Sequence, residues 1–256
     1  MNLRNFSRAS NAFLTMKILA VDASQKTVST ALMANNVILA YIFVNSGRHH
    51  SEILLQAIEE VFRLAGLEPD EVDLFAVTIG PGSFTGLRIG AATIKGLALS
   101  TGKPVVGVST LEALALNATP VGKRIICPML DAQKNQVYTA LYSPTEGTGM
   151  QKMREERIVD VDIWLEELEA GILFVGDGAV KYSPLIHRRF FSTALIAEGH
   201  QNHVNAAAAA VLAQDKFQQG QRLDLLTFTP CYLRSSEAER SIRQHTSDID
   251  KPSEFR

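Results

Sequence analysis

The chain has 256 residues, of which 46% are apolar, and its formal net charge is −2. This length suffices for one large domain or for two smaller ones, each with a core of its own. The nearly neutral charge argues against a protein that binds nucleic acid on its own, because domains that bind nucleic acid are usually clearly basic.

The cysteines and the apolar runs indicate the cellular compartment of the protein. Cys127 and Cys231 lie far apart in the sequence and form neither a metal-binding pattern nor a disulfide framework. We therefore expect a reducing, cytoplasmic environment. No run of eighteen apolar residues occurs, so we expect no membrane span.

The first 15 residues differ from the rest. They contain Arg4 and Arg8 but no acid, and they lack the long apolar block of a signal peptide. A pattern typical of folded protein begins at Met16. We expect residues 1–15 to be a leader or a cloning remnant that stays outside the fold.

Three consecutive strands open the folded part. Residues 18–21, 28–33 and 37–44 are apolar runs, and Asn35-Asn36 is typical of a two-residue hairpin turn between the last two of them. Asp22 closes the first strand. The pattern predicts an antiparallel unit with an acid at the end of its first strand.

A helix and a strand–loop–helix unit follow. Residues 51–65 repeat apolar side chains at helical spacing, which predicts an amphipathic helix. Residues 74–79 then predict a buried strand, followed by a Gly-Pro-Gly loop and a second helix that Ser83 or Thr85 caps. Gly86 and Gly90 lie one turn apart in this helix, where glycine is unfavourable, so we expect another backbone to approach closely.

The remaining chain alternates strands and helices. We predict strands at 105–108, 124–130, 136–142 and 171–175, helices after Ser109, at 161–168 and at 206–217, and a polar loop at 143–151.

Two segments share one pattern, a strand that ends in Asp-Ala followed by a second strand: LAVDASQKTVSTALM and CPMLDAQKNQVYTALY. This short repeat indicates a duplicated α/β fold of two lobes that face a cleft. We expect an N-terminal lobe at 16–112 and a C-terminal lobe at 113–240, whose last helix can pack back on the first lobe. Residues 241–256 are expected to form a flexible tail.

Asp22 is the first candidate for chemistry. Actin-like and sugar-kinase-like ATPases hold a phosphate-side metal at such a strand end, usually with Asp-x-Gly, whereas this chain has Ser24 in place of that glycine. Asp22, Ser24 and Asp131 are therefore interpreted as a vestigial phosphate site. The simpler alternative is that Asp22 makes a local turn with its own backbone.

The loop GPGSFTG has the strand–loop–helix order of an anion site, but it matches neither common phosphate-binding spacing. Arg88, one turn into the helix, is a possible anion contact, and a purely structural loop is favoured. The paired histidines do not have the spacing of a metallopeptidase site, so we predict no metal ligands and no catalytic residues.

Five segments of the sequence together resemble the TsaB family, also called YeaZ: MKILAVDAS, RHHSEILL, VTIGPGSFTGLRIGAATIKGLAL, GVSTLEALA and PCYLRSSEAE. The resemblance runs from Met16 to about Glu239. It implies an ASKHA fold, which is the two-lobed fold of actin and Hsp70, and a role in making threonylcarbamoyladenosine in tRNA.

The family resemblance also implies partners. It implies an accessory, non-catalytic subunit that pairs with a catalytic paralogue, TsaD, and works with the small ATPase TsaE. The complex as a whole uses ATP, this chain holds no cofactor tightly, and tRNA is reached only through the complex. In isolation the chain is expected to form a homodimer.

The family pairs through its first two N-lobe helices. Carried over to this sequence, the implied partner interface consists of Ile53, Leu54, Ala57, Ile58, Val61, Gly86, Leu87, Gly90 and Ile94. Two other functions remain open: an ATP-dependent small-molecule kinase of the same fold, based on Asp22, Asp131 and the Gly-Asp-Gly turn at 176–178, and a metallopeptidase.

Overall fold

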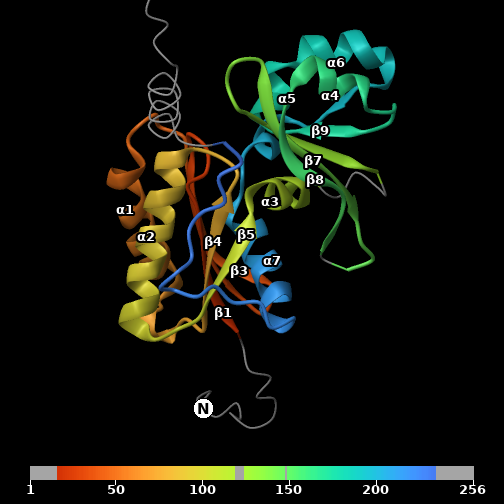
Figure 1. Ribbon diagram of the computed structural model, residues 1–256. Helices are drawn as coiled ribbons and strands as arrows, with labels where there is room; N and C mark the ends of the chain where they lie inside the picture. Colours follow the sequence, from red (N-terminus) through yellow and green to blue (C-terminus); the bar gives the residue numbers. More distant parts are fainter. Residues whose placement is uncertain (1–15, 119–123, 148, 235–256) are drawn as a thin grey trace, which may run out of the picture.

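A computed structural model describes residues 16–118, 124–147 and 149–234 (Figure 1). The chain forms two five-stranded sheets with helices on their faces, in the order β3-β2-β1-β4-β5 in the N lobe and β10-β9-β6-β7-β8 in the C lobe. The N-lobe elements are β1 (Lys17–Asp22), β2 (Val28–Ala34), β3 (Val37–Val44), α1 (His50–Ala65), β4 (Leu74–Gly80), α2 (Phe84–Thr101) and β5 (Val105–Ser109).

α3 (Thr110–Asn117) connects the lobes. The later elements are β6 (Ile126–Asp131), β7 (Gln136–Pro144), β8 (Met150–Asp160), α4 (Val161–Glu166), β9 (Leu173–Val175), α5 (Asp177–Lys181), α6 (Ser183–Phe190), β10 (Leu195–Ile196) and α7 (Ala206–Gln218). Short 3-10 turns occupy Pro69–Glu71, Phe191–Thr193 and Gly199–Asn202.

The two sheets share one topology. β1 pairs antiparallel with β2 and parallel with β4, and β6 likewise pairs antiparallel with β7 and parallel with β9. The strand orders of the two lobes therefore correspond element for element. The α/β fold with two mixed sheets, and the duplication that the short repeat indicated, are confirmed.

Helices and sheets stack in layers (Figure 1). The buried apolar side chains between these layers form three clusters. α1 and α2 cover one face of the N-lobe sheet, and α3 and α7 cover the other. α3 also packs on the C-lobe sheet, whose far face is covered by α4, α5 and α6. The central core thus belongs to both lobes.

Local sequence explains the main turns. Asn35 and Asn36 have φ of 52° and 61°, which is the type I′ hairpin that an Asn-Asn pair favours. Ser83, not Thr85, caps α2, because its Oγ accepts a hydrogen bond from the backbone N–H of Gly86. Gly66 ends α1 in the left-handed conformation, as expected of a C-cap.

The C lobe departs from the prediction in three places. Residues 143–151 were expected to form a loop, but β7 extends through Pro144 and β8 begins at Met150 as a long edge strand that pairs with β7. The helix at 161–168 ends at Glu166, and α5 and α6 were not predicted. β8 was missed because its exposed charged residues hide the alternation that marks a strand.

The expected lobe boundary after residue 112 falls inside α3, a helix that packs on both sheets. α7 packs on β1 and β2, so the expectation that the last helix returns to the N lobe is confirmed. Residues 219–234 then run along the N lobe towards the cleft; we call them the C-terminal strap. The predicted leader and tail lie outside the described residues.

Candidate functional site

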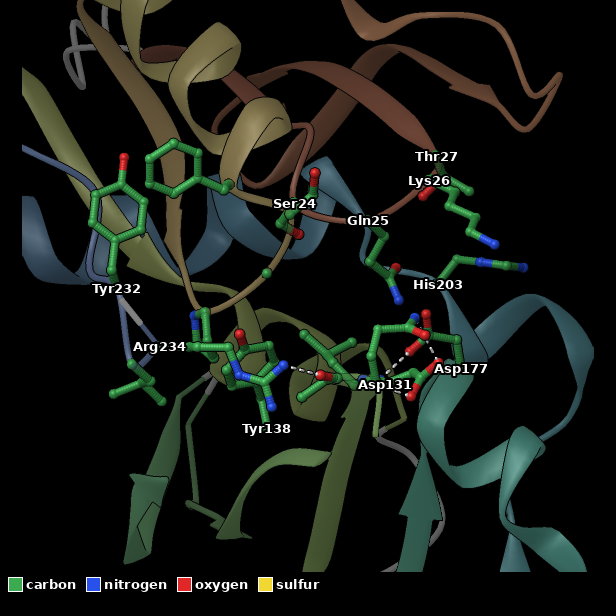
Figure 2. A pocket seen from close by; sticks show the side chains of 18 of the residues that line it. Ser24, Gln25, Lys26, Thr27, Asp131, Tyr138, Asp177, His203, Tyr232 and Arg234 are labelled. Atoms are coloured by element: carbon green, nitrogen blue, oxygen red, sulfur yellow. Dashed lines mark hydrogen bonds between the residues drawn. The ribbon is translucent and has the colours of Figure 1, made fainter. Parts of the chain in front are cut away.

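A cavity of about 880 Å³ lies between the two lobes (Figure 2). Its N-lobe wall is the turn between β1 and β2 together with the start of α2, and its C-lobe wall is the turn after β6 and the start of α5. The strap forms a third wall. The lining residues used below are Ser24, Gln25, Gly82, Asp131, Asp177, Cys231, Tyr232 and Arg234.

Asp22 lies behind the cavity wall and is completely buried. Its Oδ1 accepts hydrogen bonds from Ser24 Oγ at 2.6 Å, from the Ser24 backbone N–H at 3.2 Å and from Thr78 Oγ1 at 2.6 Å. Oδ2 is buried without a hydrogen-bond partner in the described part of the chain. Burial raises the pKa of this carboxyl, more than the three hydrogen bonds lower it.

The turn that Asp22 makes with Ser24 is the simple alternative given by the sequence, and the geometry supports it. Of the three residues assigned to a vestigial phosphate site, Ser24 and Asp131 line the cavity from opposite lobes, whereas Asp22 does not reach it. Ser24 lies between the Asp22 carboxyl and the cavity.

The Asp22 carboxyl should make stability depend on pH. Because folding raises its pKa, the protonated form is favoured in the folded state, and the resulting stability is lost as pH rises through the folded pKa. Asp22→Asn keeps the shape and the acceptor oxygen but cannot ionise. We expect the free energy of unfolding of the variant, relative to the native chain, to increase between about pH 4 and pH 7.

Urea unfolding across that pH range measures the difference in the free energy of unfolding between the variant and the native chain. Asp177, whose pKa is also raised by burial, is present in both, so its contribution cancels. A difference that stays constant with pH would contradict the expected role of Asp22.

The Gly-Pro-Gly loop packs directly against the β1–β2 turn. The Ser83 N–H donates to the Ser24 carbonyl oxygen at 2.7 Å, and a Cβ at Gly82 would lie 2.3 Å from that same oxygen. A Cβ at Gly86 would lie 1.9 Å from the Ala23 carbonyl oxygen. The close backbone approach expected at Gly86 is therefore present, and it comes from within the chain; at Gly90 a Cβ would make ordinary contacts.

The C-lobe wall holds two carboxyls near each other (Figure 2). The Asp131 N–H donates to Asp177 Oδ1 at 3.1 Å, and Asp131 Oδ2 accepts from Lys181 Nζ at 2.8 Å. Across the cavity, Gln25 is mostly buried, and its Oε1 accepts from the Val204 N–H at 2.8 Å. Sequence reasoning noted the Gly-Asp-Gly turn at 176–178 but did not include Gln25.

The C-terminal strap ties the lobes together beside the cavity. The Cys231 N–H donates to the Ile79 carbonyl oxygen in the N lobe at 2.6 Å. Three residues later, Arg234 donates to the Ala132 carbonyl oxygen at 2.6 Å and to the Gln136 side chain, both in the C lobe. This bridge was not predicted, because no short-range pattern marks a segment that reaches across more than ninety residues of sequence.

Arg88, on α2, contacts the strap at Tyr232 and is not among the residues that line the cavity. Its guanidinium lies 3.9 Å from the centre of the Phe84 ring, and its Nε donates to the Tyr232 hydroxyl at 3.2 Å. Phe84 and Tyr232 also stack on each other at 4.7 Å. Two aromatic groups of its own chain therefore contact the guanidinium, which stays exposed, and the anion contact at Arg88 stays a prediction.

Arg234→Ala should loosen the contact between the lobes. Hydrogen bonds from a charged donor contribute on the order of 1 kcal/mol or more when they are partly buried, so we expect a loss of about 1 kcal/mol in stability. Arg222→Ala is the matched control, because its guanidinium covers Phe217 and bridges no lobes. Thermal unfolding measures both, and equal losses would contradict a bridging role for Arg234.

The helix residues expected to contact a partner are instead covered by the N-lobe sheet. All nine are buried within the single chain: Ile53, Leu54, Ala57, Ile58, Val61, Gly86, Leu87, Gly90 and Ile94. The apolar stripe on each helix thus faces its own sheet, and the assignment of these nine residues to a partner interface stays a prediction that their burial does not favour. The outer faces instead expose Leu55 (53%), Leu64 (57%) and Leu99 (64%).

The described histidines do not gather as metal ligands. His50 Nε2 lies 2.6 Å from the Gln25 carbonyl oxygen, and the His203 ring lies tilted against Phe43 with ring centres 5.4 Å apart. Within residues 16–118, 124–147 and 149–234, no three His, Cys, Asp or Glu side chains converge as metal ligands would. In the same residues, no helix combines the length and apolar character needed to cross a membrane.

Comparison with known proteins places the chain in a family. The model of the TsaD family, described as tRNA N6-adenosine threonylcarbamoyltransferase, matches residues 43–242. The tRNA threonylcarbamoyladenosine biosynthesis protein TsaB of Bacillus subtilis (strain 168) is 31% identical over 227 residues, which cover 88% of this chain and 96% of that protein. The chain belongs to the TsaB family.

Two further proteins of this family are similar to the chain, one in sequence and one in structure. TsaB of Escherichia coli (strain K12) is 27% identical, over 89% of this chain and 98% of that protein. The solved structure of YeaZ from Pseudomonas aeruginosa superimposes with a TM-score of 0.72 at 25% identity, over 85% of this chain and all of that one. The resemblance to TsaB and the ASKHA fold that it implied are both confirmed.

Proposed function

We propose that this chain takes part in the synthesis of threonylcarbamoyladenosine in tRNA, as a non-catalytic partner of a TsaD-like transferase. The proposal rests first on family membership over nearly the full length of TsaB relatives that are named for this modification. The match to the TsaD family model supports a paralogous relation between this chain and the transferase.

The observation that carries the non-catalytic role is the position of Asp22. The acid that closes the first strand is the residue with which related ATPases hold a metal at phosphate. Here it is buried, donor groups of Ser24 and Thr78 occupy its Oδ1, and Ser24 separates it from the cavity. A metal-bound phosphate in the cavity could reach this carboxylate only after Ser24 had moved.

The outer faces of α1 and α2 are the surface that we assign to the paralogue. Leu55 and Leu64 on α1 and Leu99 on α2 stay exposed after both helices have packed on their sheet. Two small exposed residues of α2, Ala92 and Gly96, precede Leu99 at helical spacing and permit close approach of a second pair of helices. In the absence of the paralogue, the same face can pair two copies of this chain.

The test is threonylcarbamoyl transfer to tRNA with purified components. We expect none from this chain alone, and transfer when it is mixed with the TsaD-like paralogue and a TsaE-like ATPase. Within the complex, ATP turnover and tRNA binding would then belong to the partners, and this chain would hold no cofactor tightly. Transfer by this chain alone would overturn the proposal, and so would full activity of the paralogue without it.

An ATP-dependent small-molecule kinase is a second candidate. The cavity between the lobes and the neighbouring carboxyls of Asp131 and Asp177 favour it, because together they could hold a magnesium-bound nucleotide. Calorimetry with magnesium and ATP tests it. No heat of binding up to millimolar ligand would exclude a kinase.

A further inference from the structure

One hydrogen-bond donor on the wall of the cavity between the lobes has no acceptor. Gln25 lines the cavity and is 7% exposed. Its amide is held in one orientation, because Oε1 accepts a hydrogen bond from the Val204 N–H at 2.8 Å. The amino group Nε2 is buried and makes no hydrogen bond within the described part of the chain. Buried donors without an acceptor are costly and rare in proteins, so this one calls for a missing partner.

The Asp177 carboxyl of the C lobe lies opposite this amino group. Figure 2 shows Gln25 extending from the N lobe towards Asp177. Burial raises the pKa of Asp177, and the nearby Gln25 side chain lowers it in part. Asp177 Oδ1 accepts the Asp131 N–H at 3.1 Å, and a carboxylate has about four acceptor sites, so it can accept more. A donor of one lobe and an acceptor of the other therefore face the same small space.

The charged groups on the cavity wall are largely occupied. Asp131 Oδ2 accepts from Lys181 Nζ at 2.8 Å, and Arg234 donates to two acceptors of the C lobe. Lys26 also lines the cavity, but its side chain is exposed, so water and salt screen its charge. The cavity therefore has little free charge with which to select an ion.

The unoccupied hydrogen-bonding groups are neutral. Thr27 lines the cavity and is 2% exposed, and its Oγ1 has no partner among the described residues, as is the case for Gln25 Nε2. A hydroxyl group of a ligand suits such a site, because its oxygen accepts one hydrogen bond and donates another. A single hydroxyl can thus accept from Gln25 Nε2 and donate to the Asp177 carboxylate. Sites built in this way reject molecules that lack the hydroxyl.

The rest of the cavity can hold the body of a ligand. Tyr138 and Tyr232 line it on the side away from Gln25 (Figure 2). The volume of about 880 Å³ is within the usual range of small-molecule sites, which combine aromatic walls with a few polar groups that fix the orientation of the ligand. A ring with hydroxyl groups on its edge and apolar faces matches this arrangement.

We propose that the cavity binds a neutral sugar, with one hydroxyl oxygen of the sugar between Gln25 Nε2 and the Asp177 carboxylate. A second hydroxyl group can reach Thr27 Oγ1, while the ring packs on the tyrosine side of the cavity. Because the hydrogen bonds go to both lobes, the bound sugar holds the lobes together. Binding includes no covalent step and needs neither a metal nor ATP. It does not depend on the proposed role in tRNA modification.

The test is sugar binding to the full chain, measured by saturation-transfer NMR and by calorimetry. The probes are D-glucose, D-galactose and D-ribose, and the comparison compound is cyclohexanol, a ring with one hydroxyl group. We expect at least one of the three sugars to bind with a dissociation constant below about 1 mM, and cyclohexanol to bind at least about ten times more weakly. Thermal shifts are unsuitable, because concentrated sugars stabilise proteins without binding to them.

The variant Gln25→Glu tests the amino group alone. It keeps the length of the side chain and the oxygen that accepts from the Val204 N–H, and it replaces only Nε2. We expect the affinity for the sugar to fall about tenfold, and Asp177→Asn to weaken binding to a similar extent. The matched control is Gln133→Glu on the same cavity wall, where Nε2 already donates to Asp131; it should bind the sugar as the native chain does.

Three results would overturn the proposal. They are the absence of binding below about 1 mM for all three sugars, native affinity in a folded Gln25→Glu variant, and equal losses in Gln25→Glu and Gln133→Glu. Circular dichroism checks the fold of each variant. If Gln25→Glu does not fold, Asp177→Asn decides, and native affinity in that variant would contradict the proposed contact.

Discussion

Substituting Ile58 by glutamate is expected to unfold the N lobe. Ile58 lies on the inner face of α1 and is only 2% exposed, so the new carboxylate would be buried against the sheet without a partner. Such a charge destabilises by several kcal/mol, which is a large part of the stability of an ordinary domain. Loss of the cooperative melting transition in circular dichroism would show it.

The matched variant on the outer side of the helices should behave in the opposite way. Leu55→Glu combined with Leu99→Glu changes exposed positions, so the stability should remain within about 0.5 kcal/mol per substitution of the native value. Binding to the TsaD-like paralogue should nevertheless be lost, as measured by co-purification and calorimetry. If this variant binds normally, the surface assigned to the paralogue is wrong; if Ile58→Glu melts normally, the burial argument is wrong.

Replacing Gly86 by alanine should destabilise the chain, although the same change usually stabilises a helix. The new Cβ would lie 1.9 Å from the Ala23 carbonyl oxygen, so α2 or the β1–β2 turn must shift. Overpacking of this kind costs about 1–3 kcal/mol. Urea unfolding at constant pH provides the measurement.

Gly96→Ala is the control within the same helix. A Cβ at Gly96 has open space around it, so this variant should gain up to about 1 kcal/mol from helix propensity alone. The two alanine variants should therefore change the free energy of unfolding in opposite directions. Equal gains in both would show that the β1–β2 turn yields readily and does not constrain Gly86.

Local sequence was sufficient where a single segment determines its own structure. The Asn35-Asn36 turn, the Ser83 cap and the Gly66 helix end follow from short-range chemistry, and the structure contains all three. The duplicated topology was also visible, because each lobe begins with a strand that ends in Asp-Ala. The family resemblance then supplied the lobe arrangement, which periodicity alone does not give.

Properties that depend on distant segments were not predictable. Helical periodicity located the apolar stripe that includes Ile58, but it could not tell that the stripe's own sheet covers it while Leu55 stays outside. The sequence indicated a possible anion contact at Arg88, but it could not show that the strap places Tyr232 against this side chain. β8 lacks an apolar alternation, so its pairing with β7 determines its structure more than its own composition does.

α7 and the strap come late in the sequence but pack on the N lobe, and this order matters while the chain is being translated. A ribosome releases β1 to β5 first, but one face of their sheet is covered by α3 together with α7, and α7 begins only at Ala206. Until about four fifths of the chain has been translated, the part of that apolar face that lies under α7 stays uncovered. The nascent N-terminal half should therefore require a chaperone, and a fragment that stops before α7 should aggregate rather than fold.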